Sequence, residues 1–109
     1  MESETVGNTE PIDVIVDHLD KGELLCQLAE ESAELSQAAL KLRRAYDGTN
    51  PTPKSERECF EQLLEEMCDV CVCCTALGLD TRENRHRMAE IAQAKILRWA
   101  ARLQEEDAE

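Results

Sequence analysis

The sequence is poor in aromatic residues and glycine, and each scarcity excludes a class of structure. One Phe, one Trp and one Tyr occur in 109 residues, so a core must be built from Leu, Ile, Val, Ala, Met and Cys. Four glycines leave no glycine-rich loop to hold a phosphate, which excludes P-loop and Rossmann mechanisms. No segment reaches the ~18 continuous apolar residues of a membrane span.

Positive charge is also scarce, and this narrows the range of partners. Twelve Lys and Arg face 24 Asp and Glu, giving a net charge of −12. A nucleic-acid polymer or an anionic membrane surface requires a basic patch, so we expect neither partner. The acidic, polar N-terminus is unlike a secretory signal. We therefore expect a cytoplasmic protein whose six cysteines are reduced.

Hydrophobic periodicity predicts an all-α fold of the four-helix-bundle type, in one domain spanning residues 1–109. Strand-like alternation longer than a few residues is absent. Helices are expected over residues 11–19, 23–46, 55–76 and 81–104, with flexible tails over 1–10 and 105–109. Ser55 and Glu58 form a capping-box pattern, Asp47-Gly48 ends one helix, and an extended Asn50–Pro53 connector follows. So small a chain of aliphatic helices predicts a homodimer or homotetramer.

The most informative pattern is a pair of acids that recurs on two expected helices. Glu31 and Glu34 lie in EESAE, and Glu66 and Asp69 lie in EEMCD. Residues three apart on a helix lie one turn apart, with ~5–6 Å between their Cβ atoms. Facing one another, the two pairs would offer four oxygen ligands, which suits a hard cation such as Mg²⁺.

Glu31 lies on the same helix face as several leucines, so it is predicted to be in the core, unlike an ordinary surface acid. The predicted apolar stripes are Leu24, Leu28, Leu35 and Leu42 on one helix and Leu63, Val70 and Cys73 on the next; Glu31 and Glu66 lie on these stripes. An ionised carboxylate in a core is costly unless it is paired or bound to metal. The alternative, glutamates on solvated faces, suits Glu30, Glu61 and Glu65 better.

Two other metal patterns are weaker. Four clustered cysteines, Cys68, Cys71, Cys73 and Cys74, spread around the axis of one helix, so small buried residues are favoured over a zinc site. Glu83 and His86 form a single Glu-x-x-His, whereas a di-iron carboxylate bundle needs two such motifs and two more glutamates.

The doubled acidic motifs, EESAE followed by EEMCD, resemble those of the all-α nucleoside triphosphate pyrophosphohydrolases, the MazG-like and dimeric dUTPase-like superfamily. The resemblance covers roughly residues 24–103. The matching positions are Glu31, Glu34, Glu66 and Asp69. Thirty-one residues separate Glu34 from Glu66, a long spacing for this family, and the extra length falls between Asp47 and Arg57.

The resemblance implies an enzyme that hydrolyses a nucleoside triphosphate to the monophosphate and pyrophosphate. It implies a Mg²⁺ cofactor, with Mn²⁺ as a substitute, bound by the four acids. Glu30 or Glu31 would accept the proton of the attacking water. Lys95 and Arg98 would neutralise phosphate charge, although salt-bridged or snorkelling surface residues are the alternative for both. The competing hypothesis is a non-enzymatic acidic helical protein that uses its apolar stripes for assembly.

Overall fold

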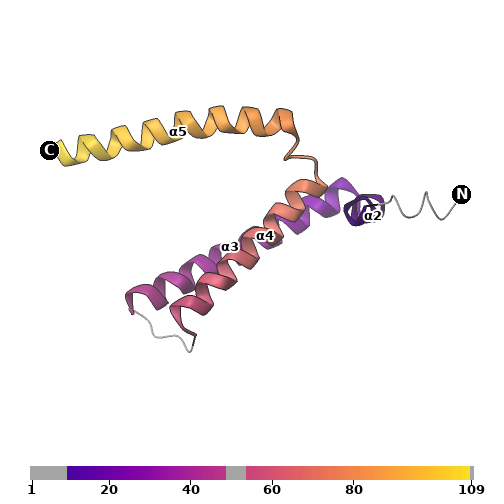
Figure 1. Ribbon diagram of the computed structural model, residues 1–109, viewed down its shortest axis with the longest axis horizontal. Coiled ribbons are helices and arrows are strands. Elements are labelled where there is room, and N and C mark those ends of the chain that lie inside the picture. Colours follow the sequence, from indigo (N-terminus) through magenta and orange to yellow (C-terminus); the bar gives the residue numbers. More distant parts are fainter. Residues whose placement is uncertain (1–9, 49–53, 109) are drawn as a thin grey trace, which may run out of the picture. The chain divides into compact units, whose positions relative to one another are not determined.

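The structure, a computed structural model, describes residues 10–48 and 54–108. These residues form four helices and no strand (Figure 1): α2 (Pro11–His18), α3 (Lys21–Asp47), α4 (Glu56–Ala76) and α5 (Arg82–Ala108). The predicted all-α fold class is therefore confirmed. Within the described ranges, no helix combines the length and the apolar character needed to cross a bilayer.

Short polar contacts fix where α3 and α4 begin. The Asp20 carboxylate accepts the backbone N–H of Glu23 at 2.7 Å, and the Glu23 carboxylate accepts that of Asp20 at 3.0 Å. This capping box starts α3 at Lys21, so Gly22 lies inside the first turn rather than before it. The predicted capping box of Ser55 and Glu58 is confirmed, with reciprocal bonds of 2.9 and 3.1 Å.

Two of the four described helices, α3 and α4, end shortly before a glycine. Gly48 follows α3 with φ +68° and Gly78 follows α4 with φ +72°, a left-handed backbone that glycine adopts without strain. Thr81 caps α5 by accepting the backbone N–H of Asn84 at 3.2 Å. The sequence predicted an end near residue 104, but α5 continues to Ala108 because no glycine or proline stops it. The predicted connector over 50–53 and the tail over 1–9 lie outside the described residues.

Helices α3 and α4 lie side by side, and α2 contacts α4 (Figure 1). The predicted stripes form their contact. Leu24 and Ala38 of α3 and Cys59, Cys73 and Ala76 of α4 are buried, and the other stripe residues are half-buried. Small side chains dominate this contact, so two long helices can approach each other closely along it. Glu31 and Glu66 are consequently held at the helix–helix contact rather than on an open surface.

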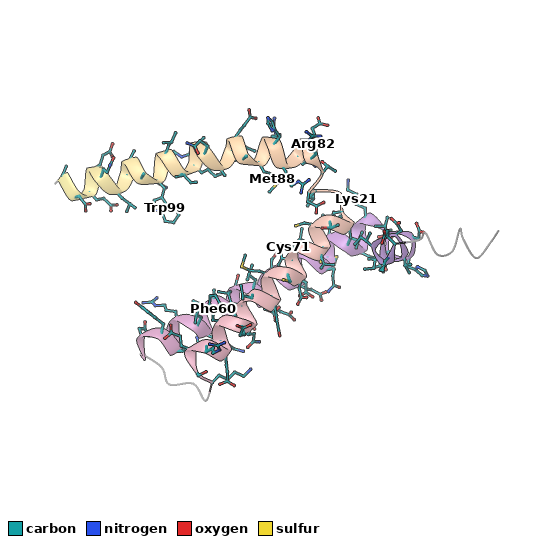
Figure 2. The ribbon with its side chains drawn as sticks, viewed as in Figure 1. Lys21, Phe60, Cys71, Arg82, Met88 and Trp99 are labelled. Atoms are coloured by element: carbon teal, nitrogen blue, oxygen red, sulfur yellow. The ribbon has the colours of Figure 1, made fainter. Side chains whose placement is uncertain are left out.

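The chain divides into two compact units, Met1–Gly78 and Leu79–Glu109, and each is described by itself. The second unit consists mainly of α5. None of the described residues of α5 is buried. Figure 2 shows Met88 and Trp99 projecting from the same side of this helix.

Candidate metal centre

Three of the four predicted acids come together where α3 and α4 meet. Glu31 and Glu34 of α3 and Glu66 of α4 each contribute a carboxylate oxygen, and these oxygens lie within 4.8 Å of one another. Among the described residues this is the one group of three or more His, Cys, Asp or Glu side chains brought so close. The spacing that placed Glu31 and Glu66 on the apolar stripes brings them to one point.

Two oxygens in this cluster are buried without a hydrogen-bond donor. Glu31 Oε2 and Glu66 Oε2 are both inaccessible to solvent and accept no hydrogen bond. Glu31 Oε1 accepts a bond of 2.9 Å from the side-chain amide of Gln27, one turn earlier on α3. Buried polar atoms are nearly always satisfied, and a bound cation is one way to satisfy two neighbouring carboxylate oxygens.

The surroundings of Glu31 disfavour its ionised form. Burial raises the pKa of the Glu31 carboxyl above its ordinary value, and the negative charges of Glu34 and Asp69 raise it further, while the bond from Gln27 acts in the opposite sense. Neighbouring acids that oppose each other's ionisation are a common feature of sites where a cation supplies the missing positive charge.

Without a divalent cation, the cluster should reduce the stability of the fold near neutral pH. Because the folded state raises the pKa of Glu31, it binds more protons than the unfolded state between the ordinary and the raised pKa. The free energy of unfolding therefore falls as the pH rises through that interval. We expect Glu31→Gln in chelator to melt a few degrees above the wild type at neutral pH. The two melting temperatures should converge as the pH falls below the ordinary carboxylate range.

Calorimetric melts at a series of pH values measure this difference. A melting temperature of Glu31→Gln that stays below that of the wild type throughout would contradict the prediction. The matched control is Glu30→Gln, because Glu30 is the exposed neighbour of Glu31 on the same helix. Its curve should follow the wild type at every pH.

Asp69, the fourth predicted ligand, lies beside the cluster rather than in it. It is exposed, and it is not among the three acids that meet within 4.8 Å. With Glu31 it lines a cavity of about 290 Å³ between α2, α3 and α4. The remaining wall residues are mostly apolar: Ile15, Leu19, Leu24, Gln27, Val72, Cys73 and Ala76. Glu31 thus borders both the acidic cluster and an apolar cavity.

Gln27 and Cys73 are the two site neighbours that the sequence analysis did not identify as such. Gln27 could have been found, since it lies four residues before Glu31 on the same helix face. Cys73 is buried in the cavity wall, and burial, followed by the charge of Glu31, raises the pKa of its thiol. It is therefore a neutral side chain that adds no charge to the site.

The other candidate residues lie apart from the three-acid cluster. Glu30 is exposed on α3, next to Glu31 in the chain. Lys95 and Arg98 are exposed on α5, in the second unit, so their role in binding phosphate stays a prediction.

The six cysteines, all within the described residues, form no disulfide, and their burial differs from what the sequence predicted. Cys73 is buried and Cys74 is half-buried, but Cys68 and Cys71 are exposed in the single chain. Figure 2 labels Cys71 on α4, where it follows Phe60, Leu64 and Met67 at helical spacing. These four side chains form an exposed, largely apolar stripe.

Comparisons with models of protein families, with curated proteins and with solved structures found no match to this chain. The likeness to the nucleoside triphosphate pyrophosphohydrolases consequently rests on the acidic motifs and on their placement in a helical fold.

Proposed function

We propose that this protein is a Mg²⁺-dependent nucleoside triphosphate pyrophosphohydrolase, which converts a ribo- or deoxynucleoside triphosphate to the monophosphate and pyrophosphate. One observation carries the proposal: Glu31 Oε2 and Glu66 Oε2 are buried without a donor in a cluster that also includes Glu34. A helical surface acid would have both oxygens in water. Two unsatisfied oxygens from different helices, close to a third acid, suit a divalent cation.

Glu31, Glu34 and Glu66 would hold the cation, and Asp69 would complete the set at the edge of the cavity. When bound, Mg²⁺ would neutralise triphosphate charge and polarise a phosphoryl oxygen. Mn²⁺, which prefers similar oxygen ligands, would serve as a substitute. The chain carries a net charge of −12 and would otherwise repel a triphosphate, so activity should depend on the cation almost completely.

A carboxylate of α3 would accept the proton of the attacking water. Glu31 is one candidate, because it lies in the cluster itself. Glu30, exposed and next in the chain, is the other candidate. Lys95 and Arg98 of α5 would neutralise the phosphates that the cation does not reach, and the apolar cavity beside Glu31 would accept the base or sugar.

The experiment is a measurement of pyrophosphate release from a panel of ribo- and deoxynucleoside triphosphates, with Mg²⁺ and with chelator. We expect pyrophosphate and monophosphate in equal amounts, with at least a tenfold loss of rate in chelator and recovery with Mg²⁺ or Mn²⁺. Inorganic phosphate as the product would contradict the proposed bond cleavage. A rate reduced less than about tenfold in chelator would contradict the role of the cation.

A non-enzymatic assembly protein is the second candidate, and the exposed stripe of Phe60, Leu64 and Met67 on α4 favours it. Such a protein should tolerate Glu31→Gln and Asp69→Asn, or gain stability from the lost repulsion. If a folded sample hydrolyses none of the triphosphates in the panel, the assembly protein is favoured over the enzyme.

A further inference from the structure

Helix α5 carries a continuous apolar seam that no residue of its own helix covers. Its side chains recur at alternating spacings of three and four, the pattern of a helix that pairs with another helix: Ala89, Ala92, Ile96, Trp99 and Leu103. Ile96, Trp99 and Leu103 are 60%, 63% and 49% exposed. A 27-residue helix in water depends largely on tertiary or quaternary packing for its stability, so this seam requires a partner.

The two ends of α5 carry opposite charge, which selects the orientation of a partner helix. The first six residues include Arg82, Arg85 and Arg87, whereas Glu105, Glu106 and Asp107 lie together near the C-terminal end. A second α5 running antiparallel would place acidic residues against basic ones at both ends. A parallel pair would place like charges together at both ends, which is unfavourable.

We propose that the partner of α5 is the α5 helix of a second copy of this chain, paired antiparallel about a two-fold axis at Ile96. In this register Arg85 of each copy lies opposite Asp107 of the other, and Ala89 lies opposite Leu103. Trp99 lies opposite the segment of Ala92 and Gln93, where the seam is narrow. Small side chains therefore meet large ones along the seam, as interdigitated packing requires.

The self-complementary register is what favours a second copy over another occupant. With the two-fold axis at Ile96, opposite charges face each other and large side chains face small ones. Two copies of one sequence produce both matches by symmetry. The seam from Ala89 to Leu103 is about 21 Å long, within a helix of about 40 Å, and Trp99 alone can bury on the order of 150 Å² or more. Across two copies the buried surface reaches on the order of 1,000 Å², the lower bound of a specific interface, so we expect a dimer that dissociates at micromolar concentration.

This interface is independent of the proposed catalytic activity. The helical period places Lys95 at the flank of the seam and Arg98 on the opposite face of α5. Pairing of the two seams therefore leaves both side chains available to bind phosphate. The inference therefore stands or falls on association alone, whatever reaction the acidic cluster supports.

Sedimentation of the full-length chain over a range of concentrations tests the interface. Ile96→Glu would place two carboxylates against each other at the two-fold axis, and we expect it to weaken dimerisation at least 100-fold. The matched control is Ala94→Glu, which adds the same charge on the opposite face and should leave dimerisation unchanged. A wild-type monomer at all concentrations, or equal weakening by both variants, would overturn the proposal.

A charge exchange tests the register and does not depend on the apolar seam. Arg85→Glu or Asp107→Lys alone should weaken the dimer severalfold, because each creates two like-charge contacts by symmetry. The double variant Arg85→Glu/Asp107→Lys should recover wild-type association. Within one straight helix these residues are about 33 Å apart, so recovery cannot arise inside a single chain. The antiparallel register would be overturned if the single variants dimerise as strongly as the wild type, or if the double variant dimerises more weakly than both single variants.

Discussion

Glu66→Gln is expected to reduce Mg²⁺-dependent pyrophosphate release at least about 100-fold while leaving the helical fold intact. Glu66 Oε2 is buried and accepts no hydrogen bond, and a bound cation would satisfy it. Glutamine replaces one carboxylate oxygen by an NH₂ group, a hydrogen-bond donor that cannot bind metal. The measurement is kcat/KM for the best triphosphate of the panel at saturating Mg²⁺.

The matched control for this prediction is Glu61→Gln. Glu61 lies on the same helix, five residues earlier, and is exposed outside the cluster. The Glu61→Gln substitution removes the same charge from the chain. It therefore distinguishes the loss of a metal ligand from a general change in the electrostatic field of the protein. We expect kcat/KM within about twofold of the wild type. Equal losses in both variants would argue for long-range repulsion rather than for a metal centre.

Glu31 should show opposite effects on stability and on activity. Glu31→Gln removes a carboxyl whose pKa is raised by burial and by neighbouring acids, and so it should stabilise the metal-free protein. The same substitution should reduce turnover at least about 100-fold, as for Glu66. Residues that lower the stability of a fold while serving its chemistry are characteristic of functional sites. The assembly hypothesis predicts only the gain in stability, so the pair of measurements separates the two functions.

The positions of Glu31 and Glu66 could be predicted because both lie on apolar stripes with clear helical periodicity. Leu24, Leu28 and Leu35 define the buried face of α3, and Glu31 falls on that face whatever the detailed packing. The capping box of Ser55 and Glu58 was predictable for a similar reason, since its contacts are local in sequence.

The place of Asp69 could not be predicted from spacing alone. It follows Glu66 by three residues, which moves it about 60° around the helix axis. Whether a side chain at that angle meets Glu31 or borders a cavity depends on how closely α3 and α4 approach and on the position of α2. Small residues such as Ala38 and Cys73 set that approach, and no periodicity encodes it.

The hydrophobic periodicity of α5 likewise does not predict which helix packs against it. An apolar stripe shows that a helix packs on something, but the same stripe suits a neighbouring helix of the same chain or of another copy. The hydrophobic pattern therefore predicts an oligomer but does not identify its interface. The distribution of charge along α5 adds the missing direction, because it distinguishes the two ends of the helix where the stripe does not.

Leu24→Ala is expected to lower the free energy of unfolding by about 2–4 kcal/mol. Leu24 is 5% exposed and is the largest of the five buried side chains of the described residues, the others being Ala38, Cys59, Cys73 and Ala76. It packs at the start of α3 in the wall of the cavity that Glu31 borders. With a core of such small side chains, little neighbouring bulk can move in to fill the space left by alanine. Urea denaturation in chelator measures the loss.

The adjacent Leu25→Ala is the matched control, because it deletes the same atoms from a side chain that is 47% exposed. In a single chain its loss should stay below about 1 kcal/mol, in proportion to the smaller area that Leu25 buries. A larger loss that diminishes on dilution would mean that a second copy covers Leu25, since the stability of an oligomer depends on its concentration. If Leu25→Ala lowers the free energy of unfolding as much as Leu24→Ala at every dilution, the buried Leu24 side chain is not the main source of stability at this end of α3.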